Sequence, residues 1–225
     1  MSFRTWGGKR RGAGRKPRGR RGVRHVRRPA VSPHEPVHIT LRVVPEVGRL
    51  RRGKCHQAVR EALKTSVKRQ LGRFRVCHIS IQGNHLHLLA EAEDRQALSR
   101  GMQGFAISCA KHLNARLGHG KKPRRGRVFA DRYHAETLEY PQRVRHCLSY
   151  VLNNWRRHRE DAGRSWRVDP FSSGRTFSGW TDASALIELR PGEEPLMVWF
   201  PRTWLLREGW QRYGPISPWE RPGPR

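Results

Sequence analysis

Residues 77–90 read Cys-His-Ile-Ser-Ile-Gln-Gly-Asn-His-Leu-His-Leu-Leu-Ala. This stretch is typical of two short β-strands that are interrupted at Gln82-Gly83-Asn84. Because the side chains of a strand point alternately to its two faces, His85 and His87 project together from one face of the second strand. Two neighbouring imidazoles on a rigid element can form half of a divalent-metal site. The alternative is a solvent-facing pair on an amphipathic strand.

The composition predicts a polyanionic partner. The chain has 47 Lys and Arg against 18 Asp and Glu, which gives a formal net charge of +29. Residues 1–30 hold twelve Lys and Arg and no acidic residue, so the remainder still carries 29 minus 12, or +17. A folded domain with this excess repels itself unless it meets phosphate, and nucleic acid is therefore the expected partner.

A membrane is the weaker alternative as a partner. The sequence has no long apolar run that could span a bilayer, and its N-terminus lacks the apolar segment of a signal peptide. The cysteines are scattered without a CxxC pair, which indicates buried free thiols rather than a zinc knuckle or a disulfide framework. They are Cys55, Cys77, Cys109 and Cys147. We therefore expect a cytoplasmic, nucleoid-associated protein, either monomeric or homodimeric.

Residues 1–35 are rich in Gly, Arg, Lys and Pro and are expected to form a disordered basic arm. Residues 14–21 read Gly-Arg-Lys-Pro-Arg-Gly-Arg-Arg. They resemble the AT-hook motif, whose Pro-Arg-Gly-Arg core lies along the narrow minor groove of A·T-rich DNA. Extended arginine side chains suit the negative potential of that groove. A generic phosphate-binding arm is the alternative. In both cases the expected DNA contacts are Arg15, Lys16, Arg18, Arg20 and Arg21.

Residues 36–158 are expected to form one globular domain. Its expected elements are a strand at Val37–Val44, a helix at Lys54–Leu71, strands at Phe74–Ile81 and His85–Glu91, a helix at Arg95–Leu117, an extended piece at Val128–Leu138 and a helix from Pro141 to about Arg159. The order β-α-β-β-α-β-α predicts an α+β fold, a ferredoxin-like antiparallel sheet with helices on one face.

Residues 159–225 are expected to form an irregular C-terminal extension rich in Trp, Pro, Gly and Ser. It shows periodicity only in short pieces such as Ala183–Leu189, and Pro201–Trp210 could form a short amphipathic helix. Aromatic side chains among arginines can stack on unpaired bases, although packing of a small irregular subdomain is favoured. The tryptophans concerned are Trp166, Trp180, Trp199, Trp204 and Trp210.

The helix predicted from Pro141 presents a tyrosine away from its apolar stripe. The stripe follows the helical repeat and consists of Val144, Cys147, Leu148, Val151, Leu152 and Trp155. At roughly 100° per residue, Tyr150 lies about 130° from the centre of the stripe. Its side of the helix is shared by Arg143, His146, Asn154 and Arg157. Asn154 is one turn beyond Tyr150 and can reach the same point in space. This placement favours a functional hydroxyl, and an exposed surface tyrosine is the alternative.

Three segments of the sequence carry a resemblance to a known family. Residues 84–89 read Asn-His-Leu-His-Leu-Leu, residues 128–134 read Val-Phe-Ala-Asp-Arg-Tyr-His, and residues 145–154 read Arg-His-Cys-Leu-Ser-Tyr-Val-Leu-Asn-Asn. In this order they resemble the HUH strand, the Val-Phe-x-x-Arg-Tyr/Phe-His segment and the tyrosine helix of HUH single-tyrosine transposases, in particular the REP-associated tyrosine transposases. The resemblance covers about residues 33–158. Trp155 replaces the usual Pro, which leaves the end of this helix open.

The resemblance implies a metal-dependent enzyme that cleaves and rejoins single-stranded or hairpin DNA. Tyr150 would attack phosphorus in line, form a 5′-phosphotyrosine and release a 3′-OH. His85 and His87, with Asn154 as third ligand, would hold Mg²⁺ or Mn²⁺ against the scissile phosphate. The substitutes for the third ligand are His134 and His146, and the other tyrosines considered as nucleophiles are Tyr133, Tyr140 and Tyr213.

Cations beyond the arm are also expected to contact the DNA backbone. They are Lys121, Lys122, Arg124, Arg125 and Arg127 in a basic loop, and Arg143 and Arg157 on the tyrosine helix. A non-catalytic DNA- or RNA-binding protein that retains the fold is the alternative, because net charge serves such a protein equally well. A pure binder, however, needs none of His85, His87 and Tyr150.

Overall fold

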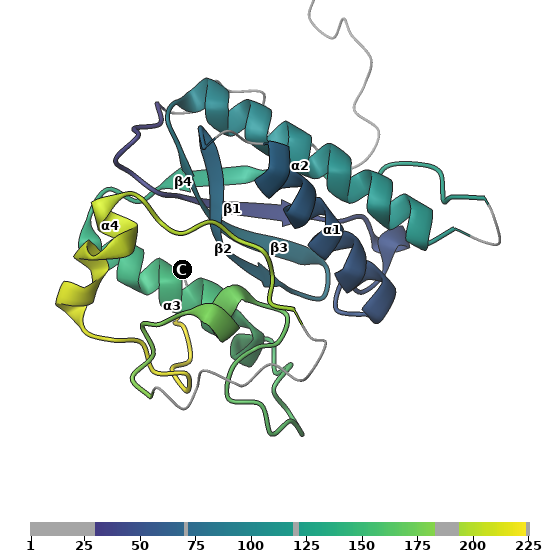
Figure 1. Ribbon diagram of the computed structural model, residues 1–225. Helices are drawn as coiled ribbons and strands as arrows, with labels where there is room; N and C mark the ends of the chain where they lie inside the picture. The colour runs from purple at the N-terminus through teal and green to yellow at the C-terminus, as the bar shows by residue number, and fades with distance from the viewer. Residues whose placement is uncertain (1–29, 70–71, 119–121, 183–193, 224–225) are drawn as a thin grey trace, which may run out of the picture.

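The computed structural model describes residues 30–69, 72–118, 122–182 and 194–223 (Figure 1). The AT-hook-like segment and the other residues of the predicted arm up to residue 29 lie outside the described residues. Lys121 and the piece Ala183–Leu189 lie outside them as well. Within the described ranges, no helix combines the length and the apolar character needed to cross a bilayer.

Four antiparallel strands form one sheet in the order β2-β3-β1-β4 (Figure 1). The strands are β1 (Val37–Arg42), β2 (Phe74–Ile81), β3 (His85–Ala92) and β4 (His134–Thr137). One long helix connects β1 to β2 and a second precedes β4. This strand order and connectivity are those of a ferredoxin-like fold, so the predicted fold class is confirmed.

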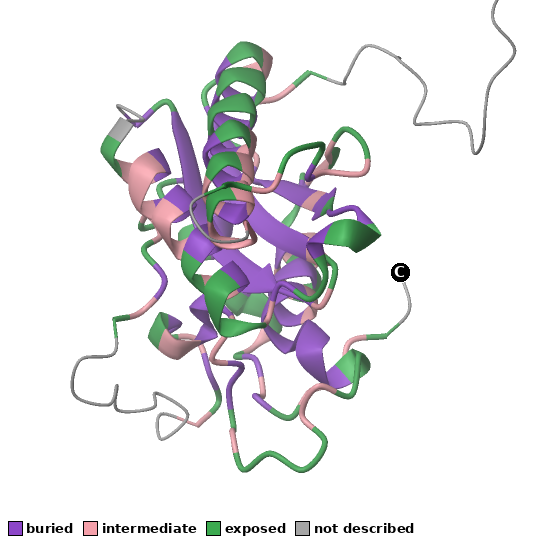
Figure 2. Cartoon of the chain, turned by 90° about the vertical axis from the view of Figure 1, so that its right-hand side faces the viewer, coloured by how far each residue is buried: buried purple, intermediate pink, exposed green. Residues whose placement is uncertain are grey.

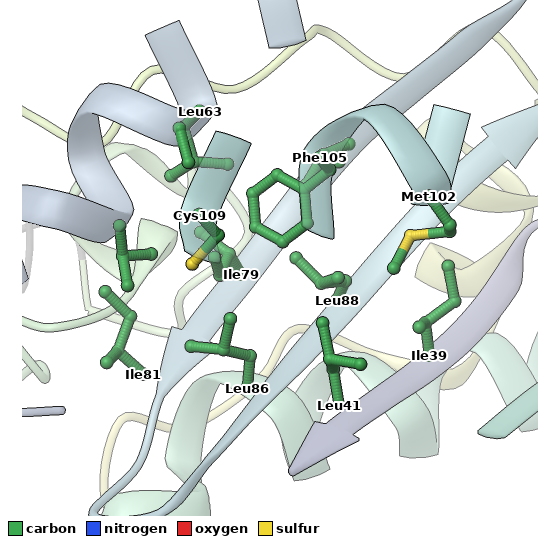
Figure 3. Close-up of a cluster of buried hydrophobic side chains, with 14 of the residues drawn as sticks. Ile39, Leu41, Leu63, Ile79, Ile81, Leu86, Leu88, Met102, Phe105 and Cys109 are labelled. Atoms are coloured by element: carbon green, nitrogen blue, oxygen red, sulfur yellow. The ribbon is translucent and has the colours of Figure 1, made fainter. Parts of the chain in front are cut away.

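Helices α1 (Gly53–Arg69) and α2 (Arg95–Arg116) pack against each other on one face of the sheet. Alternate strand residues supply apolar side chains to this face, as in β3, where Leu86 and Leu88 are fully buried. Phe105 of α2 is also buried in this cluster (Figure 3). Figure 2 shows the same division over the described residues, with buried residues through the sheet and exposed residues on the outer side of the helices.

Helix α3 (Pro141–Arg157) lies on the opposite face of the sheet, which corrects the expectation that the helices share one face (Figure 1). Its predicted apolar stripe is buried, and most of it packs with Cys77 and Leu89, residues of β2 and β3 on this second face. Pro141 occupies the first turn as predicted. Trp155 is fully buried, and the helix continues past it to its last residue, Arg157. The sheet is therefore covered on both faces.

The described parts of the C-terminal extension are tied to the domain by buried or half-buried ion pairs. Arg51 donates two hydrogen bonds of 2.8 Å to the fully buried carboxylate of Asp169. Arg145 of α3 binds Glu220 near the end of the chain at 2.6 and 2.9 Å. Breaking the Arg51–Asp169 pair would leave the carboxylate of Asp169 buried without its partner, which is costly. These contacts hold the extension against the domain.

A second anchor joins the extension to the edge of the sheet. The fully buried carboxylate of Glu91 accepts hydrogen bonds of 2.8 Å from both the backbone nitrogen and the hydroxyl of Thr203. The backbone nitrogen of Trp199 donates to the carbonyl of Val76 on the edge strand β2 at 2.8 Å. This contact covers part of an edge that would otherwise expose unpaired backbone groups. The short helices of the extension are η2 (Ser173–Thr176), α4 (Trp204–Arg207) and η4 (Gly209–Tyr213).

Packing explains several side chains of the extension. Trp180 and Trp210 are buried in the cluster under α3, so the packing alternative holds for these two tryptophans. The four cysteines are buried and free, as predicted. The short helix expected within Pro201–Trp210 is present as α4.

Candidate active site

The histidine pair, His85 and His87, projects from β3 on the sheet face that α3 covers. Their rings meet edge to face with centroids 4.6 Å apart, and their Nε2 atoms are 2.9 Å apart. Nδ1 of His85 is 2.8 Å from Oδ1 of Asn84. His87 is buried, whereas His85 is half-buried beside solvent. The two Nε2 atoms therefore converge at one point of this face.

Two residues of β1 lie beside His87. Thr40 stands directly opposite His87 in the strand register, and its hydroxyl is 3.3 Å from Nδ1 of His87. His38 lies two residues earlier on the same face, with Nε2 3.2 Å from the same nitrogen. The rings of His38 and His87 are stacked, with centroids 5.2 Å apart and planes 17° apart. Sequence analysis did not single out His38 or Thr40, although they alternate with buried apolar residues of β1.

Tyr150 of α3 lies over this cluster. Its ring meets the ring of His87 edge-on with centroids 5.2 Å apart, and that of His38 with centroids 6.0 Å apart. The tyrosine is half-buried. Although it lies away from the centre of the apolar stripe, as predicted, it reaches the histidines of the sheet.

Asn154 is one turn beyond Tyr150 and fully buried. Its side-chain nitrogen and oxygen have no hydrogen-bond partner within the described part of the chain. A further turn along the helix, the ring of His158 meets the ring of His85 with centroids 5.6 Å apart. Tyr150 thus touches one histidine of the pair and His158 the other, and Asn154 lies between them on the same side of the helix. A buried amide with no partner at this position is suited to binding a ligand, because burying it unpaired is otherwise costly.

The surroundings of His85 keep its imidazole neutral. Burial, reinforced by the nearby charges of His158 and Arg42, lowers the pKa of His85 to about 4. A neutral imidazole has a lone pair available for a metal ion. A hollow of about 390 Å³ opens beside this ring and is also lined by Arg49, His158 and Glu160. Sequence analysis missed His158, although its position two helical turns after Tyr150 is a usable signal.

The basic loop places its predicted DNA contacts in different environments. Lys122, Arg125 and Arg127 are exposed. Arg124 is half-buried and donates hydrogen bonds to Oδ1 of Asn114 at 2.8 Å and to the carbonyl of Arg127 at 3.2 Å. Arg124 therefore holds the loop in shape, while its neighbours face solvent.

The two cations predicted on α3 each contact another part of the chain. Arg143 forms an ion pair with Glu136 of β4, which lies opposite His38 in the strand register. Arg157 is exposed and donates to the carbonyl of Gly223 at 2.8 Å. Both side chains remain at least partly open to solvent.

The substitute ligands and nucleophiles lie farther from the histidine pair. His134 is exposed. Thr40 of the middle strand pairs with His87 on one side and with His134 on the other, so His134 and His87 are two strand spacings, or roughly 10 Å, apart. His146 is exposed on α3, one turn before Tyr150. The other tyrosines are Tyr133, packed against the core under α1 and α2, Tyr140, exposed before α3, and Tyr213, exposed in η4.

No three His, Cys, Asp or Glu side chains in the described ranges are grouped so that they could hold a metal ion. An amide can also supply a metal ligand, and the buried amide of Asn154 is suited to that role because amide oxygens bind Mg²⁺ and Mn²⁺.

Comparison with known proteins gives a family match that covers this site. A family model described as IS200-like transposase matches residues 37–154, just over half of the chain. No match was found among curated proteins.

Similar solved structures include a REP-associated tyrosine transposase bound to a REP hairpin. It is 16% identical in sequence with a TM-score of 0.49, and the match covers 67% of this chain and 82% of that one. A Deinococcus radiodurans R1 protein assigned as a transposase is 11% identical with a TM-score of 0.38, over 65% of this chain and 100% of that one.

Proposed function

Because the chain belongs to the IS200-like transposase family, we propose that it is a metal-dependent single-strand DNA transposase of the REP-associated branch. It cleaves and rejoins hairpin or repeat DNA through a 5′-phosphotyrosine on Tyr150. The observation that carries the proposal is the edge-on contact between Tyr150 and His87, with ring centroids 5.2 Å apart. The motifs at residues 84–89, 128–134 and 145–154 support the assignment to the branch.

Tyr150 is the nucleophile in this proposal. Its phenolic oxygen attacks the scissile phosphorus in line, so that a tyrosine–phosphate bond forms and the bond from phosphorus to the 3′ oxygen breaks. The phenol loses its proton, and the departing 3′ oxygen gains one. A phenol ordinarily keeps its proton at neutral pH, so the site has to stabilise the developing phenolate. The half-buried position over two histidines restricts the ring to one approach.

His85, His87 and Asn154 would hold Mg²⁺ or Mn²⁺. The Nε2 atoms of the two histidines are 2.9 Å apart, which suits neighbouring ligands of an octahedral ion, expected at about 3 Å for bonds of about 2.1 Å. The fully buried and unpartnered amide of Asn154 can supply oxygen as the third ligand. When bound, the ion acts as a Lewis acid on the phosphate and offsets charge in the transition state.

Rejoining runs through the same residues in reverse. The phosphotyrosine conserves the energy of the broken phosphodiester bond, so a 3′-OH can attack it and restore a strand without ATP. This is a physical reason for a tyrosine nucleophile, because hydrolysis by water would release that energy. The half-exposed face of His85 and its adjoining hollow give the strand a way to the site.

Substrate form is inferred from where the site is open. The half-buried side of Tyr150 and the hollow of about 390 Å³ beside His85 would admit one strand. The exposed cations Lys122, Arg125 and Arg127 can hold an adjoining duplex stem by its phosphates. We expect the basic arm to add further contacts that do not depend on sequence.

The test is incubation of the full chain with 5′- or 3′-labelled hairpin DNA and Mn²⁺, followed by a denaturing gel. The expected result is a covalent adduct, mapped by peptide sequencing to Tyr150, that carries the fragment lying 3′ of the break. This fragment is joined to the protein through its 5′ phosphate, so the 3′ label stays with the protein and the 5′ label leaves on a strand with a free 3′-OH. Binding without an adduct, at any hairpin or metal concentration, would leave a non-catalytic DNA-binding protein as the better account.

A further inference from the structure

We propose that His38 is a positioning residue that fixes the ring of His87 for metal binding by accepting a hydrogen bond from its Nδ1. The inference rests on the proposed function, because it assigns a role beside the proposed metal ligand. His38 is 2% exposed, and its Nε2 is 3.2 Å from Nδ1 of His87.

The chemistry of imidazole makes such a partner necessary. Nε2 of His87 is the atom that faces Nε2 of His85, at 2.9 Å. If it binds a metal through its lone pair, the ring proton must sit on Nδ1. An N–H in a buried site then needs an acceptor, and metal-bound histidines regularly have one that sets both tautomer and ring orientation.

His38 and Thr40 both face Nδ1 of His87, and they are not equivalent. Thr40 Oγ1 is 3.3 Å away, but its hydroxyl rotates and can donate or accept. His38 is stacked on His87, with planes 17° apart, and its ring is also met edge-on by Tyr150 with centroids 6.0 Å apart. The ring of His38 is thus held from two sides. We assign the orienting role to His38 and a supporting role to Thr40.

The position of His38 in the sheet explains how it acts on both the metal ligand and the nucleophile. It lies in β1, the strand next to β3, and is held there by antiparallel pairing with Leu89 and Glu136. Neighbouring strands place their side chains about 5 Å apart on a common face. A correct His87 orientation therefore depends on the register between β1 and β3.

The test separates the hydrogen bond from packing. His38→Phe keeps a ring that can stack on His87 but removes the acceptor, whereas His38→Gln retains a side-chain acceptor at a similar reach. His78→Phe is the matched control, because His78 is another buried histidine on the sheet, packed edge-on against Phe177. Binding of Mn²⁺ to the full chain without DNA is measured by electron paramagnetic resonance. The Mn²⁺ concentration that gives half the maximal rate of adduct formation is the second readout.

We expect His38→Phe to weaken Mn²⁺ binding about tenfold or more and to raise the half-maximal Mn²⁺ concentration to match. His38→Gln should recover most of the affinity, Thr40→Val should have a smaller effect, and His78→Phe should bind Mn²⁺ as the original chain does. Unchanged affinity in His38→Phe would overturn the inference, as would an equal loss in His78→Phe or no recovery in His38→Gln.

One further comparison separates this inference from the proposed function. The original chain should bind Mn²⁺, and the double change His85→Ala with His87→Ala should remove that binding. If the original chain binds no Mn²⁺ and shows no metal-dependent adduct, the metal site itself is wrong and the role of His38 falls with it. If the original chain binds Mn²⁺ and forms the metal-dependent adduct, but His38→Phe behaves as the original chain, only the role of His38 is wrong.

Discussion

The ring of Tyr150 lies against the rings of both His87 and His38. We expect Tyr150→Phe to abolish the covalent adduct, because the phenyl ring preserves those contacts but lacks the attacking oxygen. DNA affinity, measured by fluorescence anisotropy, should stay nearly the same. Tyr140→Phe is the control, because Tyr140 is exposed at the start of the same helix. An adduct that persists and maps to Tyr133 or Tyr140 would show that the nucleophile is another residue.

The ligand set gives a second prediction at the residue scale. Changing either His85 or His87 to Ala should remove metal-dependent cleavage, because one imidazole and an amide hold a divalent ion weakly. Asn154→Ala should weaken Mn²⁺ binding, while Asn154→Asp should retain it because a carboxylate also offers oxygen. Calorimetric titration with Mn²⁺ measures both effects. Normal activity of Asn154→Ala would show that Asn154 is not the third ligand.

At the scale of helices and strands, periodicity in the sequence predicted most of the fold. The alternation in β1, the helical spacing in α1 and α2 and the stripe of α3 all correspond to observed elements. Each of these patterns arises from burial on one side of a single element, so it can be read locally. The side of the sheet that α3 covers could not be read in this way. An apolar stripe shows that a helix is buried, but it does not show which face of the sheet receives it.

The same limit explains which site residues the sequence did not reveal. His85 and His87 are two positions apart on one strand, and Tyr150 and Asn154 are one turn apart on one helix, so both pairs follow from local geometry. His38 is 49 positions from His87, and only the register of β1 against β3 brings them together. Long-range pairing of this kind is fixed by the assembled sheet.

A buried histidine between β2 and the C-terminal extension is expected to make the stability of the fold sensitive to acid. His78 is buried near Ser173 and Phe177, and burial lowers its pKa to about 4, against the opposing charge of Glu91. Between pH 6.5 and 4 the unfolded chain takes up a proton here that the folded chain does not. Stability is therefore lost as the pH falls through this window, by on the order of 3 kcal/mol when complete.

Urea unfolding from pH 7 to 4 measures this effect. We expect His78→Phe to show a flatter fall in the free energy of unfolding than the original chain, because it removes the group that takes up the proton. His146→Phe serves as the control, since His146 is exposed on α3. Parallel pH dependences for the original chain and His78→Phe would show that another group governs acid stability.

At the scale of the whole molecule, charge is distributed over both the arm and the folded domain. Residues 1–30 carry twelve cations without an acid. Deleting them should flatten the salt dependence of DNA binding, because each lost phosphate contact lowers the slope of log affinity against log salt by about 0.9 for duplex DNA. Cleavage of a saturating hairpin should survive the deletion. Replacing only the cations of residues 14–21 by Gln should give an intermediate slope. If the deletion of residues 1–30 instead abolished cleavage of a saturating hairpin, the arm would help to build the active site.

The exposed loop cations and the position of Tyr150 together predict which form of DNA is cut. Tyr150 is half-buried on α3, the helix over this sheet face, whereas Lys122, Arg125 and Arg127 are exposed on a loop after α2. A strand can pass beside the tyrosine while a stem is held by its backbone, so we expect one cut at a fixed position near the foot of a hairpin. Specificity should come from stem shape and from a few unpaired bases, because a cationic surface reads shape and stacking better than base edges.

Labelled hairpin and fully paired linear duplex of the same sequence provide the measurement. The duplex should bind through the arm and the loop but remain uncut, because neither of its strands can enter beside Tyr150 without unpairing. A hairpin with its foot closed by extra base pairs is the matched control and should be cut more slowly, in proportion to the cost of opening those pairs. Efficient cutting of both strands of the duplex would contradict this account. It would indicate a metal-dependent nuclease in which water, rather than Tyr150, attacks phosphorus.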